Sequence, residues 1–112
     1  MPYEIIFAPE AIEDLQQLKA QIRAAVRAAL VAHLRHEPTR VSKSRIKRLR
    51  GVRRPQYRLR VDEIRIFYDV GDAEVEVLAI VNKSDADAWL RQFGEAERGG
   101  PDEADPALGS EE

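Results

Sequence analysis

Apolar residues in the first third of the chain recur at the spacing of an α-helix. Pro9, whose φ suits the first turn of a helix, begins one such segment, and the pattern predicts a helix over Pro9–Lys19. A second run predicts a helix over Gln21–Arg35. Neither Gly nor Pro separates the two segments, so one long helix is the alternative. We expect a hairpin break near Lys19–Gln21, because a hairpin suits the core of a small domain better. The apolar positions are Ile12, Leu15 and Leu18 in the first segment and Ile22, Val26, Leu30 and Leu34 in the second.

The apolar pattern changes to a period of two in the second half of the chain. Three such segments, separated by short turns, predict an antiparallel meander. An early strand precedes the helices, and a short helix capped by Ser84 or Asp85 follows the meander. This order predicts one α+β domain, with a strand, a helical hairpin, a three-stranded meander and a short C-terminal helix, and with the helices on one face of the sheet. The expected strands are Tyr3–Phe7, Gln56–Val61, Ile64–Val70 and Glu74–Val81, and the expected last helix is Asp85–Phe93.

Length and composition restrict the class of protein. A chain of 112 residues has room for one domain with a modest core, which excludes a multidomain enzyme. It has no cysteine, and therefore no disulfide, thiolate nucleophile or cysteine-bound zinc. No apolar signal segment occupies Met1–Phe7, and no apolar run approaches the roughly 20 residues that cross a membrane. These features favour a cytoplasmic protein without a membrane partner.

The formal net charge of −2 is the difference between two oppositely charged parts of the chain. From Glu95 onward there are seven acids and one arginine, among glycines and prolines, with Leu108 as the one large apolar side chain. Such a segment cannot bury enough apolar surface to offset the entropy of ordering. We therefore expect a folded domain over residues 1–93 and an acidic, disordered tail over residues 94–112. The part of the chain up to Gly94 has 17 basic and 13 acidic residues and is cationic.

The positive charge is concentrated between Arg40 and Arg60. Ten of these 21 residues are basic and none is acidic. A basic block of this density favours a surface that binds a polyanion, above all nucleic acid. The alternative is that acids elsewhere, such as Glu10, Glu13, Asp14 or those of the tail, neutralise the block in the folded protein.

Two opposed arginines are expected in the hairpin that joins the first two strands of the meander. A tight turn at Asp62-Glu63 pairs Arg60 with Arg65 and Arg58 with Phe67, on the face opposite to the apolar residues. Like charges directly opposite each other destabilise a sheet. Their presence therefore favours a site for an anion such as phosphate, with the Phe67 ring available to stack on a base. The alternative is that nearby acids neutralise the arginines in surface ion pairs, namely Asp62, Glu63 and Asp69.

Other kinds of site have little support in the sequence. His33 and His36 lie three residues apart near the end of a predicted helix, but no third metal ligand accompanies them. There is no serine-nucleophile motif, no phosphate-binding loop and no dinucleotide-binding glycine motif. We expect neither a metal nor another cofactor.

Six short segments carry a resemblance to a known family through their order and spacing. They are Tyr3-Glu-Ile-Ile-Phe7, Ala8-Pro9-x-Ala11-x-x-Asp14-Leu15-x-x-Leu18, Leu49-Arg-Gly51, Tyr57-Arg-Leu-Arg-Val61, Arg65-Ile-Phe-Tyr68-x-Val70 and Val75-x-Val-Leu-x-Ile80. Together they resemble the RelE/ParE superfamily of toxins from type II toxin–antitoxin systems, and the resemblance covers about residues 3–92.

The resemblance implies a fold, partners and an activity. The fold is a helical hairpin packed on a four-stranded, largely antiparallel sheet. The partners are a cognate antitoxin that covers the basic face and, on operator DNA, a toxin–antitoxin heterotetramer. RelE-like members are ribosome-dependent endoribonucleases that cut mRNA and inhibit translation. In their reaction a ribose 2′-hydroxyl attacks the adjacent phosphate and leaves a 2′,3′-cyclic phosphate, so the ribosome and mRNA are further implied partners.

The family pattern also implies site residues. Two basic residues on the first meander strand fall on Arg58 and Arg60, an arginine on the next strand falls on Arg65, and a basic residue after the last strand falls on Lys83. Cationic side chains at such positions stabilise negative charge on a phosphate in the transition state. The expected catalytic residues are Arg60, Arg65 and Lys83, and the expected RNA-binding residues are Arg45, Lys47, Arg48, Arg50, Arg54, Arg58 and Phe67.

Two departures from the RelE pattern leave the general base open. The pattern has a tyrosine near the C-terminus, where this chain has Trp89 and Leu90. It has lysines on the first meander strand, where this chain has arginines, which are poor bases. The remaining groups are Tyr57, Tyr68 and Lys83. One alternative is a ParE-like protein that binds DNA gyrase without nuclease chemistry, and another is a decayed member that survives as an antitoxin-binding or autoregulatory partner.

Overall fold

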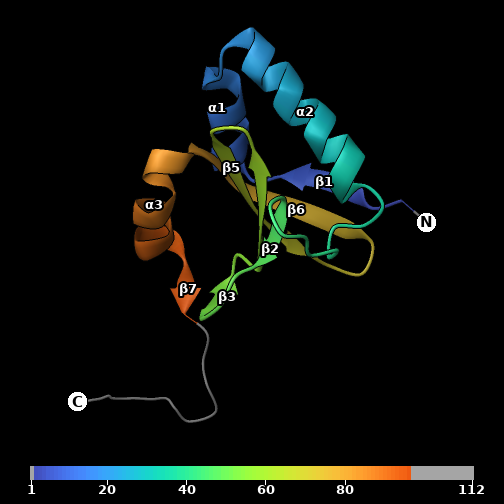
Figure 1. The fold of residues 1–112 in the computed structure, drawn as a ribbon, viewed down its shortest axis with the longest axis vertical. Coiled ribbons are helices and arrows are strands. Elements are labelled where there is room, and N and C mark those ends of the chain that lie inside the picture. Colours follow the sequence, from blue (N-terminus) through green and yellow to red (C-terminus); the bar gives the residue numbers. More distant parts are fainter. Residues whose placement is uncertain (1, 97–112) are drawn as a thin grey trace.

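The computed structural model describes residues 2–96 of the chain, which form an α+β domain (Figure 1). The helices are α1 (Pro9–Gln17), α2 (Ala20–Leu34) and α3 (Ala86–Phe93), and the 3₁₀ turn η1 (Lys83–Asp85) precedes α3. The strands are β1 (Glu4–Phe7), β2 (Ile46–Arg48), β3 (Val52–Arg54), β4 (Tyr57–Val61), β5 (Ile64–Val70), β6 (Glu74–Asn82) and β7 (Glu95–Ala96). The main sheet has the order β1-β6-β5-β4-β2, and β3 and β7 form a separate two-stranded sheet. Among the strands of residues 2–96, only β1 and β6 pair in parallel.

The helical hairpin forms as the pattern predicts. It breaks at Leu18 and Lys19, which adopt extended backbone with ψ of 148° and 149°, next to the expected break at Lys19–Gln21. The guanidinium of Arg23 donates to the carbonyls of Gln16 and Leu18 at 3.2 and 3.1 Å. This arginine of α2 thus satisfies carbonyl groups that the last turn of α1 leaves without helical partners, and the break needs neither glycine nor proline.

The core lies between the helical hairpin and the main sheet. One apolar face of α1 and one of α2 pack on the face of the sheet to which Leu59, Ile66 and Tyr68 belong. The Tyr68 hydroxyl donates to the carbonyl of Pro38 at 2.6 Å, and this buried bond fixes the chain that follows α2. The buried residues of the hairpin are Ala11, Leu15, Val26, Leu30 and Leu34.

The meander has the predicted register. Arg60 pairs with Arg65 and Arg58 with Phe67 across β4 and β5, and Asp62 and Glu63 form the connection. Asp62 has a φ of 51°, in the left-handed region that suits a tight turn and that Asp adopts more readily than most residues. The turn therefore contains two residues, and the alternating side-chain pattern passes through it without a shift.

The structure confirms the α+β class and adds detail that the pattern did not predict. The expected four-stranded sheet has a fifth strand, because β2 pairs with β4. The helices do not all cover one face. The hairpin packs on the core face, whereas Trp89 of α3 stacks on Phe67 on the opposite face. The expected caps of the last helix are also absent, since neither Ser84 nor Asp85 makes a side-chain capping bond at η1 or α3.

The start of the predicted tail belongs to the fold. Glu95 and Ala96 form β7, which pairs with β3, so the folded domain extends past the expected boundary at residue 93. The predicted disorder of the acidic stretch beyond Ala96 lies outside the described residues. No helix in the described part of the chain is long and apolar enough to cross a membrane.

Candidate nucleic-acid interface

Four basic residues occupy neighbouring positions on the sheet face that turns away from the helical hairpin. Lys47 of β2 pairs with Arg58 of β4, and Arg60 of β4 pairs with Arg65 of β5. Strand alternation places these side chains opposite to Ile46, Leu59 and the other core residues. We call Lys47, Arg58, Arg60 and Arg65 the cationic face.

No ion pair neutralises the cationic face within residues 2–96, where the ion pairs involve Arg40, Arg53 and Arg54 only. Arg58 is half-buried, and its Nε is buried without a hydrogen-bond partner in the structure. Burial, and then the charges of Arg65 and Arg60, lower the pKa of the Arg58 guanidinium. A buried donor without an acceptor is costly, and an anion bound at the cationic face would supply the negative charge that the Arg58 guanidinium lacks within residues 2–96.

Arg65 is held in place by the hairpin turn. Its guanidinium donates to the carbonyls of Asp62 and Ile64, at 2.8 and 3.0 Å. These bonds orient the group without cancelling its charge. The carboxylates of Asp62, Glu63 and Asp69 form no ion pair with the cationic face in the described structure, so the expected alternative of ordinary surface neutralisation does not apply to it.

Lys83 lies at the same end of the sheet as Arg60 and Arg65. It begins η1 directly after β6, and its backbone N–H donates to the carbonyl of Glu63 at 2.7 Å. Its neighbours in β6 continue the pairing, with Val81 opposite Arg65. The fold therefore brings the three residues predicted as catalytic to one end of the sheet, although Lys83 is about 20 residues away in sequence from the hairpin turn.

Arg54 is paired with acids, whereas the sequence prediction treated it as an unpaired cation of the RNA-binding set. Its guanidinium pairs with Asp69 at 3.0 Å, Glu76 at 3.3 Å and Glu95 at 4.0 Å. Glu95 also pairs with Arg53. Burial raises the pKa of Asp69, and it outweighs the hydrogen bond from Gln56 and the charge of Arg54, which lower it. Acids from distant segments thus neutralise this part of the basic block.

Phe67 is not available to stack on a base, which is a second correction. Its side chain has no exposed surface, because the Trp89 ring stacks on it with centroids 4.9 Å apart and an interplanar angle of 10°. Phe93 contacts the same Trp89 ring at 5.5 Å. The apolar residue on the predicted open face is thus part of the contact between β5 and α3.

Two of the other predicted RNA-binding arginines, Arg48 and Arg50, lie apart from the cationic face, whereas Arg45 adjoins it. The Arg60 N–H donates to the Arg45 carbonyl at 2.8 Å, and both residues line one hollow. The Arg48 guanidinium packs 5.4 Å from the centroid of the Tyr57 ring, and it donates to the carbonyl of Gln56 at 2.8 Å. Arg45 lies 2.9 Å from Nε2 of His33 on α2, and burial and then Arg45 lower the pKa of that histidine. Arg50 is exposed between β2 and β3. The basic block therefore divides between the cationic face, a neutralised pair at Arg53 and Arg54, and an edge beside α2.

Of the candidate bases, only Lys83 lies beside the cationic face. Tyr57 and Tyr68 stack on each other at 5.5 Å and belong to the core side of the sheet. The Tyr68 hydroxyl is committed to Pro38, and burial and then Tyr57 raise its pKa above the ordinary value. No group of three or more metal-ligating side chains occurs in residues 2–96.

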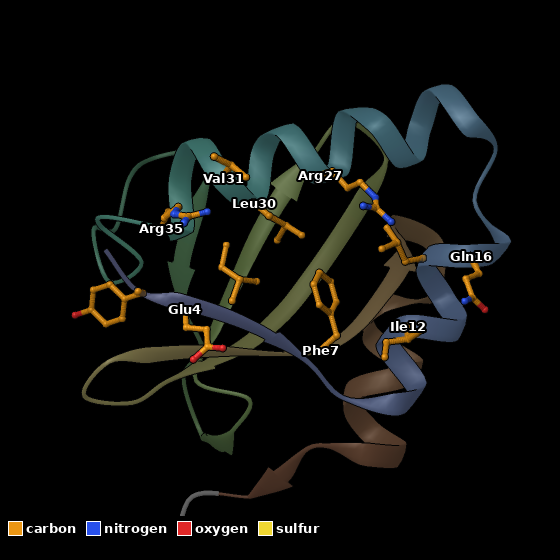
Figure 2. A pocket seen from close by; sticks show the side chains of 11 residues that line it. Glu4, Phe7, Ile12, Gln16, Arg27, Leu30, Val31 and Arg35 are labelled. Carbon is orange, nitrogen blue, oxygen red and sulfur yellow. The ribbon is translucent and has the colours of Figure 1, made fainter. Parts of the chain in front are cut away.

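A separate apolar groove lies on the other side of the molecule, between β1, α1 and α2 (Figure 2). Its volume is about 510 Å³. Ile12 and Val31 line it although 43% and 51% of their surfaces are exposed, and β1 is an edge strand of the main sheet. Arg27 and Arg35 flank the apolar centre along α2 (Figure 2). The groove was not predicted from the sequence. The feature that could have indicated it is Val31, an apolar residue of α2 that does not belong to the four-residue repeat of Val26, Leu30 and Leu34.

Fold and charge together define a small α+β domain with a cationic sheet face. The sequence model of the family described as "ParE toxin of type II toxin-antitoxin system, parDE" matches residues 5–86. The chain therefore belongs to this family, within the RelE/ParE superfamily of type II toxins. No curated protein matches the sequence.

Solved structures of RelE-type toxins share the fold. The toxin–antitoxin complex RelBE2 of Mycobacterium tuberculosis contains a chain with 30% identity and a TM-score of 0.61, over 73% of this chain and 99% of that one. The archaeal RelE–RelB complex of Pyrococcus horikoshii gives 22% identity and a TM-score of 0.61, over 74% and 97%. An arginine-to-alanine mutant of E. coli RelE in the free state gives 21% identity and a TM-score of 0.61, over 83% and 99%.

Proposed function

We propose that this toxin is a ribosome-dependent mRNA endoribonuclease that binds the RNA backbone on its cationic face. The observation that carries the proposal is the set of three neighbouring arginines, Arg58, Arg60 and Arg65, with no carboxylate partner in the described structure and with an unsatisfied donor at Arg58 Nε. Guanidinium groups bind phosphate oxygens through paired hydrogen bonds, so a phosphodiester supplies both the acceptors and the charge that the face lacks.

In the proposed reaction, a ribose 2′-hydroxyl attacks the adjacent phosphorus and the bond to the 5′-oxygen of the next nucleotide breaks. The products are a 2′,3′-cyclic phosphate and a free 5′-hydroxyl, and the proton lost by the 2′-hydroxyl balances the proton gained by the leaving oxygen. Arg60 and Arg65 stabilise the charge that builds on the non-bridging oxygens. Lys83, at the same end of the sheet, is the proposed proton-transfer group.

The proposed dependence on the ribosome follows from what the face lacks. Among the described residues, Lys83 is the one amine at the end of the sheet that holds Arg60 and Arg65, because Lys47 lies opposite Arg58, two positions further along β4. The arginines do not act as bases at neutral pH. A reaction that needs both a base and an acid then takes the second group, and the alignment of the RNA, from the much larger target. Such a target places the site of action in the cytoplasm.

A cognate antitoxin is the proposed protein partner. Several similar structures are toxin–antitoxin complexes, including those from M. tuberculosis and P. horikoshii. The groove between β1, α1 and α2 supplies a contact surface for an apolar segment of such a partner, and Arg27 and Arg35 favour acids at its two ends (Figure 2). A toxin–antitoxin heterotetramer on operator DNA is part of the same proposal.

A second function, binding of DNA gyrase without nuclease chemistry, is favoured by a different observation. Both candidate tyrosines lie on the core side of the sheet, and Trp89, where the RelE pattern has a tyrosine, stacks on Phe67 and has no acidic proton to transfer. The family model that matches is also that of ParE.

Cell-free translation of a defined mRNA separates the two functions. We expect the protein to produce new RNA 5′ ends only in the presence of ribosomes, and Arg60→Gln to reduce the cleavage rate at least tenfold. Lys19→Gln is the matched control, because it removes an exposed positive charge between α1 and α2, outside the cationic face and outside the predicted RNA-binding residues. Blocked supercoiling by purified gyrase without cleavage of translated mRNA would replace the nuclease proposal by the gyrase proposal.

A further inference from the structure

The acidic stretch that follows β7 is the one large source of negative charge that the proposed function does not use. Residues 97–112 contain six acids and a single arginine. The cationic face has no acidic partner within residues 2–96. One chain thus contains an unneutralised cluster of positive charge and, next to its last strand, a matching excess of negative charge.

The acidic stretch begins beside the basic block in space, because the strand that precedes it, β7, pairs with β3 of that block. β7 pairs with β3, with Val52 opposite Ala96 and Arg54 opposite Glu95. Glu95, the first acid of the run, already pairs with Arg53 and Arg54. Arg58 follows Arg54 by four residues, so the segment starts beside the strand that leads into the cationic face.

The segment is long enough to reach every residue of the cationic face. Sixteen residues span at most about 53 Å when extended, whereas the longest dimension of the domain is 47 Å. A covalent tether of this length holds the acids at an effective concentration on the order of millimolar. Individually weak contacts between carboxylates and guanidinium groups then suffice for substantial occupancy.

We propose that residues 97–112 bind the cationic face as an internal anionic ligand and compete with RNA for it. Carboxylates of the segment accept hydrogen bonds from Arg58, Arg60 and Arg65 and take the place of phosphate groups. RNA displaces the segment where phosphates are dense, as on a ribosome, so stray contacts with other nucleic acid are suppressed. Only the identity of the competitor, RNA, rests on the proposed function; the contact between segment and face does not.

Binding of fluorescent oligouridylate of 12 nucleotides tests the competition. Three chains are compared, namely the full chain, a chain that ends at Ala96, and a full-length chain in which the six acids of residues 97–112 are changed to the corresponding amides. We expect the second and third to bind about three- to tenfold more tightly than the first at low salt, and the difference to disappear at about 0.5 M salt. Equal affinities of the three chains at low salt would overturn the proposal.

A pair of further chains shows where the segment acts. In Arg58→Gln/Arg60→Gln/Arg65→Gln, removal of residues 97–112 should change oligouridylate binding less than 1.5-fold, because the face that the segment occupies is gone. A gain as large as in the unmodified background would mean that the segment repels RNA from a distance, and it would exclude the contact.

An experiment without RNA separates this inference from the proposed nuclease. In ¹⁵N NMR spectra, the Nε–Hε signal of Arg58 should shift when residues 97–112 are removed, because its Nε has no partner in residues 2–96. The exposed side chain of Arg27, on α2 and away from both β7 and the cationic face, serves as the reference whose signal stays fixed. An unchanged Arg58 signal would reject the contact, whereas a shifted signal in a protein that cuts no mRNA would retain the contact and reject the nuclease.

Discussion

Arg60 and Arg65 face each other across the β4–β5 hairpin, and neither pairs with a carboxylate in the part of the chain that the structure describes. Opposed like charges on a sheet cost about 0.2–1 kcal/mol. The two-residue turn at Asp62 and Glu63 fixes this pairing, and Arg65 is bonded to the turn's carbonyls, so the charges cannot move apart by a change of register. The arrangement costs stability, and the proposed anion site accounts for that cost.

Arg60→Gln should therefore raise stability while it lowers activity. The exposed Arg60 side chain makes no ion pair in the described residues, so its replacement removes repulsion and little else. We expect the free energy of unfolding in urea to rise by a few tenths of a kcal/mol and the affinity for single-stranded RNA to fall. Lys19→Gln, outside the cationic face and the predicted RNA-binding residues, should change neither quantity. A loss of stability in Arg60→Gln would show that the charges do not repel in the folded protein.

Tyr68→Phe should lower stability without a specific loss of activity. The substitution removes a buried hydroxyl that donates to Pro38 at 2.6 Å and leaves that carbonyl without its partner. We expect a loss of about 1–3 kcal/mol in the free energy of unfolding, measured by urea denaturation. Cleavage per folded molecule should stay within twofold of the unmodified chain. A collapse of cleavage in a folded Tyr68→Phe protein would return this tyrosine to the list of general bases.

The cluster around Arg54 should make stability depend on pH. Burial raises the pKa of Asp69 in the folded protein above its unfolded value of 3.8. As pH rises through the window above 3.8, the unfolded chain loses its proton before the folded one, so Asp69 contributes a fall in stability across that window. Asp69→Asn removes this contribution and keeps an acceptor for the backbone N–H of Gln56.

Urea denaturation between pH 3.5 and pH 6 measures the effect of Asp69. Relative to the unmodified chain, Asp69→Asn should become more stable as pH increases through the window. Glu37→Gln, which alters the exposed pair with Arg40, is the control and should show no such trend. A trend of the opposite sign would mean that Arg54, not burial, dominates the pKa of Asp69.

The hairpin and its register were predictable from the sequence because both depend on local information. Alternation fixes which residues share a face, and a two-residue turn fixes which of them pair, so Arg60 opposite Arg65 follows from the order of residues alone. The helical hairpin is similar, since the spacing of Leu15, Val26 and Leu30 defines its buried faces.

The features that were missed depend on segments that are far apart in sequence. Arg54 is neutralised by Asp69 and Glu76, 15 and 22 residues later, and no local pattern shows that these acids surround it. β2 was missed because a three-residue strand with a single buried residue, Ile46, has no readable period. The cationic face could be predicted in its centre at β4 and β5, whereas the separation of Arg54 from it required the structure.

Phe67 is buried beneath Trp89, whereas the sequence predicted that it stacks on a base of the RNA. A substitution of Phe67 distinguishes these two roles. Had Phe67 stacked on a base, its replacement would cost about 1–3 kcal/mol of RNA binding free energy. In the structure its ring has no exposed surface and contacts Trp89 at 4.9 Å. Phe67→Leu keeps an apolar side chain in the same space, so RNA affinity should stay within twofold while stability falls by about 1 kcal/mol.

Trp89 is the only tryptophan in the chain, so its fluorescence reports directly on the contact with Phe67. In Phe67→Leu the emission should shift to longer wavelength, because the stacked ring that shields Trp89 from water is replaced by a smaller side chain. Phe93→Leu, at the exposed side of the same tryptophan, is the matched control and should shift the emission less. If Phe67→Leu instead abolished RNA binding while Trp89 emission and stability stayed unchanged, α3 would have to leave the sheet when RNA binds.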